Sequence, residues 1–374
     1  MIGLKGIPAK WGGIEKYVEE IGAHLANRGH YVTVFGSNWY CKDFVGHTYR
    51  GMQLVRLPVF HTQATDALNN ALLASLIVIF SKYDIVHFHN YAAYYFVPFV
   101  KLFGKITVIT SHGLVDDSWR NPKYNSFATR VIINAGKVGM RSADRVTTVA
   151  DYWRQRIQEY CGRDADVLPS GLDDVTIRRP NIIKEKYGLC GDDFILFLGR
   201  IDPVKRIEWL AKLRCQEEKK IVIAGGAQDA ATQTYYSRLH EMSSRQTVFT
   251  GPVYGAEKEE LLSNCRLFVN PSITEGLPIT VLEAMSYGRC CVASSIPSHS
   301  QIIRDGQTGF LFDKASENEL RKLITKLLSM TKTEIQSIGM QARKELEGAY
   351  DWAKTSLSTE RIYWELVHKR RTRK

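Results

Sequence analysis

Eight short, nearly all-apolar runs alternate along the chain with longer stretches of helical periodicity. Apolar and polar residues do not alternate within these runs, which is typical of strands buried on both faces of a parallel sheet. The runs are Tyr31–Phe35, Ile85–His89, Ile106–Thr110, Arg145–Val149, Phe194–Leu198, Lys220–Ala224, Leu267–Asn270 and Cys290–Ala293. With 374 residues, the chain is long enough for two domains. The pattern therefore predicts two doubly wound α/β units.

Two helical stretches frame the expected domains. Apolar residues recur at helical spacing from Ile14 to Leu25, and Gly29 ends that pattern. A second long stretch runs from Asp351 to about Lys369. Residues 177–181 separate the two sets of strands, so we expect an N-terminal domain over 1–178 and a C-terminal domain over 179–350. Residues 351–374 would form a closing helix with a basic tail.

Three observations limit where the protein works. The longest apolar run, Ala71 to Phe80, has 10 residues, whereas a membrane-spanning helix needs about 20. The N-terminus has no charged segment followed by an apolar one, so no cleaved secretion signal is expected. Seven cysteines are scattered without a Cys-x-x-Cys pair, which argues against disulfides and against a zinc site. We therefore expect a cytoplasmic protein with reduced thiols.

The chain is basic, with a net charge of +11. Residues 1–180 hold 21 Lys and Arg against 15 Asp and Glu, and the last seven residues, His368 to Lys374, add five positive charges. This balance suits nucleic acid, an anionic membrane or a phosphorylated substrate. Because no nucleic-acid-binding motif accompanies the charge, nucleic acid is not expected as a partner.

The strongest motif links a strand end, a loop and a helix start. Glu275 and Gly276 lie in the loop, and Pro278 marks the start of the helix. Glu283 follows Glu275 by eight residues, a little over one turn into that helix. Both carboxylates could thus face the crevice at the carboxyl end of the sheet, where α/β folds bind ligands. The simpler alternative is a loop acid and a solvated helix acid. The Gly-Leu-Pro and Ala-Met that accompany the glutamates favour the functional interpretation.

Two further motifs follow strand ends. In the segment from Gly199 to Lys205, Arg200 and Lys205 could clamp a diphosphate, since arginine supplies a planar fork and lysine a point charge. Gly12 and Gly13 stand between the first strand and the first helix, where backbone could approach a ligand closely. Their spacing matches neither the dinucleotide fingerprint nor the P-loop. Each segment on its own also fits an ordinary strand–helix turn.

Together these motifs resemble glycosyltransferase family 4, retaining nucleotide-sugar transferases of the GT-B fold. The resemblance covers nearly the whole chain and rests on Gly6 to Glu15, Ser111 to Leu114, Pro169 to Asp173, Gly199 to Lys205, Phe249 to Val253 and Glu275 to Met285. The first of these segments further resembles a rhamnosyltransferase-like subgroup that builds bacterial surface polysaccharides. The implied fold is α/β, with two Rossmann-like domains of doubly wound parallel sheets facing a central cleft. The first domain would bind the acceptor and the second the nucleotide sugar.

The resemblance also implies roles for residues of the second domain. Arg200 and Lys205 would hold the donor diphosphate, Glu283 would bind the ribose hydroxyls, and Glu275 would face the donor sugar. Val253 would meet the base. The backbone alongside the sugar would come from Gly276, Leu277, Pro278 and Ile279.

In the first domain, Gly12 and Gly13 would close over the phosphates, and His112 would sit by the sugar. The implied reaction is a same-face displacement in which a leaving phosphate oxygen accepts the proton of the acceptor. Glu275 is then a positioner and an electrostatic partner. The residues implied in catalysis are His112, Glu275, Arg200 and Lys205. The resemblance implies no metal and no cofactor besides the nucleotide sugar.

Two patterns could suggest a metal, and we interpret both as structural. Asp164 and Asp166 form an Asp-x-Asp sequence, but it stands far from any glycine-rich loop and is typical of a surface turn. His87 and His89 alternate on one strand, where core or cleft-wall histidines are the more common case.

The chain departs from the family pattern at two places. Only Met1 to Leu4 precede the first glycine loop, which predicts a short first strand and a weakened sheet edge. Ser170 stands where the family usually has asparagine, a mild change at a polar turn.

An anionic membrane is a further expected partner. The segment from Asn90 to Lys105 is rich in aromatic residues and ends in lysines, and Arg120, Lys123 and Arg130 follow it. Such surfaces suit a membrane interface, and a basic tail would add to them. A glycan or polyprenyl-linked acceptor at the inner face of the membrane would use both features. The simpler alternative is a core helix with two solvated lysines.

Two other functions compete with glycosyl transfer. A nucleotide-sugar epimerase of the same fold would need water-activating acids in the cleft. A non-catalytic basic protein that binds membranes or nucleic acid would show no donor binding, and its affinity would fall steeply with salt.

Overall fold

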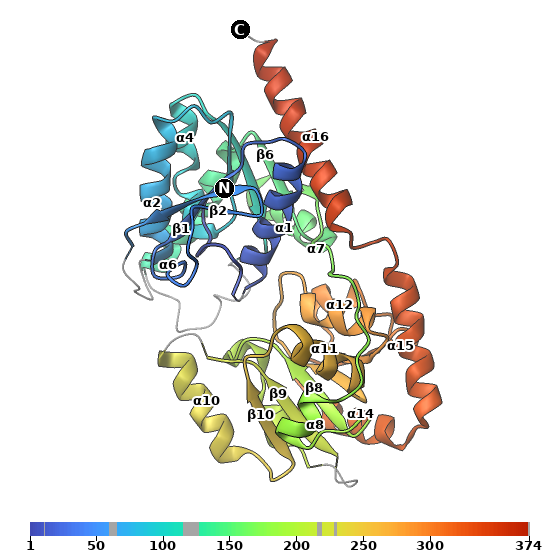
Figure 1. Cartoon of the computed structure of the whole chain (residues 1–374). Helices are drawn as coiled ribbons and strands as arrows, with labels where there is room; N and C mark the ends of the chain where they lie inside the picture. The colour runs from blue at the N-terminus through green and yellow to red at the C-terminus, as the bar shows by residue number, and fades with distance from the viewer. Residues whose placement is uncertain (11, 60–65, 115–126, 215–218, 228–229, 373–374) are drawn as a thin grey trace. The chain divides into compact units, whose positions relative to one another are not determined.

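The computed structural model describes residues 1–10, 12–59, 66–114, 127–214, 219–227 and 230–372 (Figure 1). The chain divides into two compact units, one of Met1–Gly171 with Asp351–Lys374 and one of Leu172–Tyr350. Each unit is built mainly from parallel strands with helices between them, and the pair β2–β3 of the first unit is antiparallel. The predicted α/β class of two Rossmann-like units is confirmed. Arg120 and Lys123 lie outside the described residues.

The first unit contains two sheets joined by the start of the chain. One sheet has the order β1-β3-β2, and the other has the order β4-β5-β6-β7 with all strands parallel. The strands are β1 (Thr33–Ser37), β2 (Thr48–Tyr49), β3 (Met52–Leu57), β4 (Ile85–Phe88), β5 (Ile106–Ser111), β6 (Arg145–Thr148) and β7 (Asp166–Val167). Ile2 bridges Phe88 of β4 in parallel, and Met1 accepts a hydrogen bond from the Phe35 N–H of β1. The expected short first strand is thus reduced to a two-residue connection.

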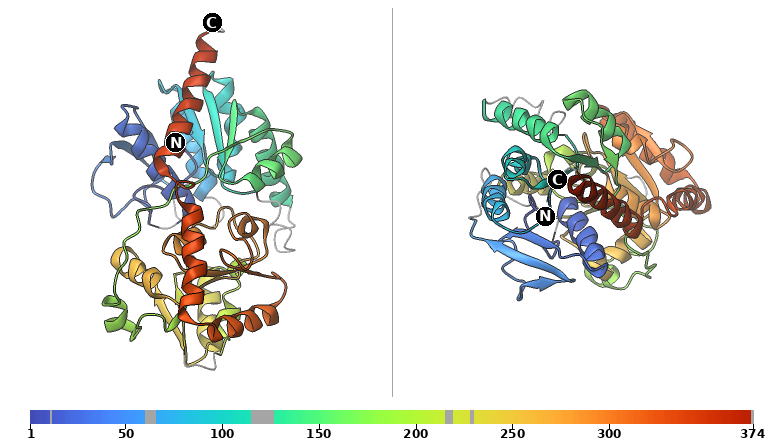
Figure 2. Two further views of the ribbon diagram at one scale, coloured as in Figure 1. Left: turned by 90° about the vertical axis from the view of Figure 1, so that its right-hand side faces the viewer. Right: turned by 90° about the horizontal axis from the view of Figure 1, so that it is seen from above.

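The helices of the first unit come from both ends of the chain. They are α1 (Gly13–Asn27), α2 (Asp66–Ile79), α3 (Tyr91–Tyr94), α4 (Val97–Leu102), α6 (Phe127–Ser142), α7 (Asp151–Cys161) and α16 (Trp352–Arg371). Helix α16 runs beside α1 (Figures 1 and 2). Glu360 of α16 accepts hydrogen bonds from Arg28 and His30 at 2.7 Å each, and the Tyr363 hydroxyl bonds His87 at 2.6 Å. These contacts attach the last helix to the first unit.

The second unit is a six-stranded sheet with the order β10-β9-β8-β11-β12-β13. Its strands are β8 (Phe194–Leu198), β9 (Lys220–Ala224), β10 (Thr247–Gly251), β11 (Leu267–Asn270), β12 (Cys290–Ser294) and β13 (Phe310–Phe312). The chain runs outward from β8 through β9 to β10, then returns to place β11 on the other side of β8. This reversal creates a switch point between β8 and β11, where open α/β sheets bind ligands.

Eight helices cover the described part of this second sheet. They are α8 (Ile182–Tyr187), α9 (Glu208–Ala211), α10 (Ala230–Met242), α11 (Gly255–Asn264), α12 (Ile279–Ser286), α13 (Pro297–Ser300), α14 (Glu317–Ser329) and α15 (Lys332–Leu346). The apolar side chains of the strands divide into two buried clusters, one containing Phe194 and Phe268 and the other Ile195 and Leu267. Consecutive residues therefore pack on opposite faces, which explains why the runs are apolar throughout.

The eight strands predicted from apolar runs are confirmed to within two residues at each end, with β8, β9 and β11 at the predicted bounds. Strands β3 and β13 are among those that the apolar runs do not predict. Strand β3 buries only Met52, Leu54 and Leu57 among its six residues, and β13 has three residues, so neither forms a continuous apolar run. Within the residues described, no helix is both long and apolar enough to span a membrane.

Candidate functional site

Two loops meet at the switch point of the second unit, one after β8 and one after β11. In the first loop, the Asp202 side chain accepts the Val204 N–H at 3.0 Å and so caps a 3-10 turn over Pro203–Lys205. The Ile273 N–H of the second loop donates to the Val204 carbonyl at 2.9 Å. This direct bond between the loops brings Lys205 beside Glu275.

Lys205 and Glu275 form an ion pair, with Nζ and Oε1 2.5 Å apart. Their side chains are only 13% and 12% exposed, so the pair is largely withdrawn from water. The same Glu275 oxygen also accepts hydrogen bonds from the Ser272 hydroxyl at 2.8 Å and from the Asn270 amide at 3.3 Å. Three donors thus hold one carboxylate oxygen in place, as a positioned anion requires.

The environment keeps Glu275 ionised. Burial by itself raises the pKa of this carboxyl, but the charge of Lys205, the nearby His299 and the Ser272 hydroxyl outweigh it, so the pKa lies below its usual value. Glu275 is therefore a fixed negative charge near neutral pH. It is not poised to act as a general acid.

His299 of α13 is a site residue that the sequence motifs do not reveal. Its ring is fully buried, Nδ1 lies 2.9 Å from the Ser294 carbonyl, and Nε2 has no hydrogen-bond partner among the described residues. Burial lowers the pKa of His299 to about 4, against the opposing attraction of Glu275. The sequence feature that could have revealed His299 is its position just after β12, which places it at the same edge of the sheet as Glu275.

Two other predicted residues of this unit have different surroundings. Arg200 follows β8 with an exposed side chain, and no described residue forms an ion pair with it. Glu283 of α12 is paired with Lys258 of α11 at 2.7 Å through Oε1. Arg200 is thus available to bind an anion. A hydroxyl group that binds to Glu283 would share the Glu283 carboxylate with Lys258.

The remaining predicted positions lie at the ends of β10 and β11. Val253 is 6% exposed and packs into the core, so only its backbone can face a ligand. Pro278 is the N-cap of α12, which confirms the predicted helix start. Gly276 and Leu277 lead into the helix, and Ile279 is its first residue, with its N–H donating to the Leu277 carbonyl at 2.9 Å.

In the first unit, His112 directly follows β5 and is half-buried. Its ring lies edge-on to Tyr17, with centroids 5.0 Å apart, and its Nε2 is 3.5 Å from Nδ1 of the buried His89. Burial lowers the pKa of His112 to about 3, so the imidazole is neutral at physiological pH. His87 and His89 are buried, which confirms them as core histidines.

The glycine loop of the first unit is anchored by the carboxylates of α1. Gly12 has a φ of 100° and is the N-cap of α1, and a β-carbon there would collide with the Glu15 carboxylate. That carboxylate accepts the Lys5 N–H at 3.0 Å, and Glu19 accepts the Ala9 N–H at 2.6 Å. Only glycine allows this close approach at the start of the helix, where Gly13 is the first residue.

Comparisons with known proteins identify the family of the chain. A family model described as Glycosyltransferase Family 4 matches residues 11–175, and one described as Glycosyl transferases group 1 matches residues 181–345. The chain belongs to glycosyltransferase family 4. This family member is 32% identical over 205 residues to the serotype-specific mannosyltransferase WbdA of Escherichia coli, a match that covers 50% of this chain and 25% of WbdA. The chain thus covers a quarter of that relative's length.

Solved structures show the same GT-B fold. Sucrose-phosphate synthase from Thermosynechococcus elongatus has a TM-score of 0.83 at 18% identity, with 98% of each chain covered. HepE from Anabaena in complex with UDP-glucose has a TM-score of 0.76 at 17% identity, covering 95% of this family 4 chain and 97% of HepE. At these identities the likeness establishes the fold.

Proposed function

We propose that this protein is a retaining glycosyltransferase that moves a sugar from a nucleotide diphosphate sugar to a glycan or polyprenyl-linked acceptor. The observation that carries the proposal is the cation Lys205 held beside an ionised Glu275 at the switch point, with the exposed Arg200 at the end of the adjoining strand β8. Membership of family 4 and the UDP-glucose complex of a structural neighbour support a nucleotide-sugar donor.

The reaction uses charge stabilisation rather than an acid–base pair. The bond between the anomeric carbon and the diphosphate oxygen breaks, and negative charge grows on that oxygen. Arg200 and Lys205 neutralise this charge in the transition state. The acceptor oxygen bonds the anomeric carbon from the same face, and its proton passes to a leaving phosphate oxygen. Because two protein cations supply the positive charge, we propose that no metal is required.

Glu275 and His112 orient the donor in this scheme. The three donors on Glu275 keep its carboxylate from rotating, so it can accept hydrogen bonds from sugar hydroxyls in one geometry. His112 is neutral, and its Nε2 lies 3.5 Å from Nδ1 of His89, so its Nδ1 is the ring nitrogen proposed to contact the sugar.

A thermal-shift panel with UDP, GDP, dTDP and their sugar conjugates tests the donor assignment. A ligand at about 100 times its dissociation constant adds roughly 2.7 kcal/mol of stability. We expect one nucleotide to raise the melting temperature and Arg200→Ala to abolish that shift. Arg245→Ala is the control, since this exposed arginine precedes β10 at the opposite edge of the sheet. If the nucleotide shifted the melting temperature of both variants equally, or if no nucleotide shifted that of the unaltered protein, the proposal that Arg200 binds a nucleotide-sugar donor would be wrong.

The neutral state of His112 has a consequence for pH dependence. Its pKa is about 3 in the folded protein against 6.5 ordinarily, so below pH 6.5 the unfolded chain binds a proton that the native protein does not. The free energy of unfolding therefore falls as the pH drops below about 6.5. The His112→Asn variant should lose less stability over the same pH range. Melting temperatures of both proteins between pH 5 and 7.5 measure the effect. An unchanged slope in the variant would show that His112 titrates normally.

We also propose that the first unit docks on an anionic membrane through an apolar–basic face. Helix α2 exposes apolar side chains along its outer side, and the segment around α4 adds exposed aromatic residues (Figure 1 shows the two helices side by side). The apolar members are Leu68, Leu72, Leu76, Ile77, Phe80, Tyr95, Phe99, Leu102 and Phe103. Phe80 and Leu102 are more than 80% exposed. An apolar surface of this kind marks an interaction site.

Cations border the apolar–basic face near the end of α16. A hollow there is lined by Lys82, Lys105, Arg370 and Arg371, together with the acidic Asp84. Lys101 is also close, but it is paired with Asp144 at 2.8 Å. The excess of positive charge beside exposed aromatic and aliphatic side chains matches anionic headgroups above acyl chains.

Removal of residues 369–374 should weaken membrane binding. Each basic residue near an anionic surface contributes about 1 kcal/mol, so the loss of five charges should lower vesicle binding at least about tenfold at low salt. Sedimentation with vesicles containing phosphatidylglycerol measures the effect, and vesicles of phosphatidylcholine alone provide the control. Unchanged sedimentation would exclude the tail from membrane docking. Leu102→Asp tests the apolar part of the face in the same assay.

A further inference from the structure

Two neighbouring strands of the first unit each end in a histidine. His89 directly follows β4, and His112 directly follows β5. Because β4 and β5 pair in parallel, with Phe88 opposite Ile109, both histidines lie at the carboxyl edge of the sheet. His89 Nδ1 lies 3.5 Å from His112 Nε2, at the outer limit of a hydrogen bond. The two rings are therefore joined directly.

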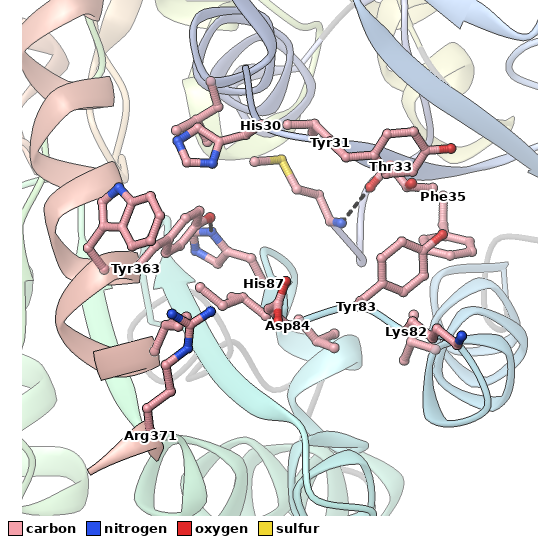
Figure 3. A pocket seen from close by; sticks show the side chains of 18 residues that line it. His30, Tyr31, Thr33, Phe35, Lys82, Tyr83, Asp84, His87, Tyr363 and Arg371 are labelled. Carbon is pink, nitrogen blue, oxygen red and sulfur yellow. Dashed lines mark hydrogen bonds between the residues drawn. The ribbon is translucent and has the colours of Figure 1, made fainter. Parts of the chain in front are cut away.

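His89 has no alternative partner within the described part of the chain. Its side chain is 1% exposed, and its Nε2 atom makes no hydrogen bond there. The ring of His87 packs against it with centroids 4.1 Å apart, but both nitrogens of His87 are engaged. Nδ1 of His87 lies 2.6 Å from the Tyr363 hydroxyl, and Nε2 lies 2.7 Å from the Thr110 hydroxyl (Figure 3 shows His87 beside Tyr363). The hydrogen bonding of the His89 ring is thus directed to His112.

The unpartnered Nε2 atom indicates which nitrogen of His89 carries the proton. Burial lowers the pKa of His89 well below its usual value, so the ring is neutral, with one N–H donor and one acceptor nitrogen. In buried protein, an N–H group without an acceptor is a rarer defect than an acceptor that lacks a donor. We therefore place the proton on Nδ1 of His89, where it is donated to Nε2 of His112.

The surroundings of His112 hold its ring in one orientation. Tyr17 of α1, which is fully buried, lies edge-on to it with centroids 5.0 Å apart. The Ser111 hydroxyl donates to the Gly113 carbonyl at 3.2 Å and so fixes the turn that carries His112. Since Nε2 of His112 accepts from His89, the proton of the neutral His112 ring is on Nδ1. His112 consequently presents an N–H donor, rather than an acceptor nitrogen, to a ligand.

We propose that His89 is a positioning residue that holds His112 as an Nδ1–H donor. This role rests on the proposed function, in which His112 orients the donor sugar. A ring N–H that is fixed in advance donates only to an oxygen lone pair, so His112 would select a sugar oxygen at one place. Binding then requires neither rotation of the ring nor a shift of its proton, which lowers the cost of ordering the site.

Nuclear magnetic resonance of the free protein tests the tautomer without any ligand. A spectrum that correlates the ring protons with the ring nitrogens of nitrogen-15-labelled histidine distinguishes a protonated nitrogen from a bare one. The signals that are absent from His112→Asn belong to His112. Near neutral pH we expect both His112 and His89 to be protonated on Nδ1.

Two substitutions of His89 separate hydrogen bonding from packing. His89→Leu keeps a buried apolar side chain but removes the donor, so His112 should shift largely to the Nε2–H tautomer that an unconstrained imidazole favours. His89→Asn retains a donor, because its amide nitrogen is two bonds from Cβ, as Nδ1 of histidine is. His112 should therefore stay protonated on Nδ1 in this variant. His47→Leu is the control, since His47 is an exposed histidine that directly precedes β2 of the same unit.

Transfer from the nucleotide sugar that the thermal-shift panel identifies gives the second readout. We expect kcat/KM to fall about tenfold in His89→Leu, as for the loss of one positioned hydrogen bond, and to be largely restored in His89→Asn. Protonation of His112 on Nε2 in the unaltered protein would overturn the proposal. So would an Nδ1 proton that survives in His89→Leu, or equal transfer by that variant and the unaltered protein. A complete lack of transfer by the unaltered protein would instead contradict the proposed function, and the tautomers would still decide the role of His89.

Discussion

Replacement of Lys205 with alanine is expected to lower the transfer rate about 10²- to 10³-fold, the usual cost of removing one group that stabilises transition-state charge. Lys205 lies at the switch point with its ammonium 2.5 Å from Glu275, so the alanine variant also leaves a largely buried carboxylate with only its neutral hydrogen-bond partners. Removal of one member of a buried pair is destabilising in its own right. Activity and melting temperature must therefore be measured together.

The double variant Lys205→Ala/Glu275→Gln separates the two effects. An amide in place of the carboxylate has no charge to leave unpaired, so the melting temperature should recover relative to Lys205→Ala, while transfer stays low. Lys212→Ala is the matched control, because this exposed lysine follows α9 of the same unit. Near-normal turnover in Lys205→Ala would show that Lys205 does not hold the donor diphosphate as proposed.

Gly225→Ala should abolish the donor-induced thermal shift and destabilise the second unit by about 1–3 kcal/mol, as backbone strain and overpacking do. Gly225 follows β9 with a φ of 157°, and a β-carbon there would collide with the carbonyl oxygen of Gly199, the residue before Arg200. The Gly225 N–H also donates to the Gly251 carbonyl at 2.9 Å. The backbone segments at the ends of β8, β9 and β10 thus contact one another at this glycine.

The control for this variant is Gly191→Ala. A β-carbon at Gly191 meets only the Asn264 Oδ1 atom, at 3.5 Å, which is an ordinary contact. Both variants are compared by melting temperature with and without the nucleotide that the panel identifies. A normal donor-induced shift in Gly225→Ala would mean that the position of Gly199 and Arg200 does not control donor binding.

The strands and their ends could be predicted from the sequence because they obey a local rule. A strand buried on both faces must be apolar at every position, so Phe194–Leu198 and Leu267–Asn270 are recognisable directly. Residues just after such runs lie at the carboxyl edge of a parallel sheet. The runs alone therefore place Arg200, Glu275 and His112 at strand ends.

Which side chains meet at those ends depended on packing between distant segments. The pairing of Lys205 with Glu275 spans 70 residues and results from the strand order, which sets β8 beside β11. The partner of Glu283 could not be predicted either, because Lys258 comes from a different helix and has no motif of its own. His299 was missed for the same reason, as its role depends only on its proximity to Glu275.

By itself, then, the sequence determined eight of the strands, the fold class and the positions of the motifs, since apolar periodicity and turn residues act over a few neighbours. Only the tertiary structure decided the charge states and the surfaces. Burial depends on what other segments cover, and this makes His112 neutral and leaves the face of α2 exposed.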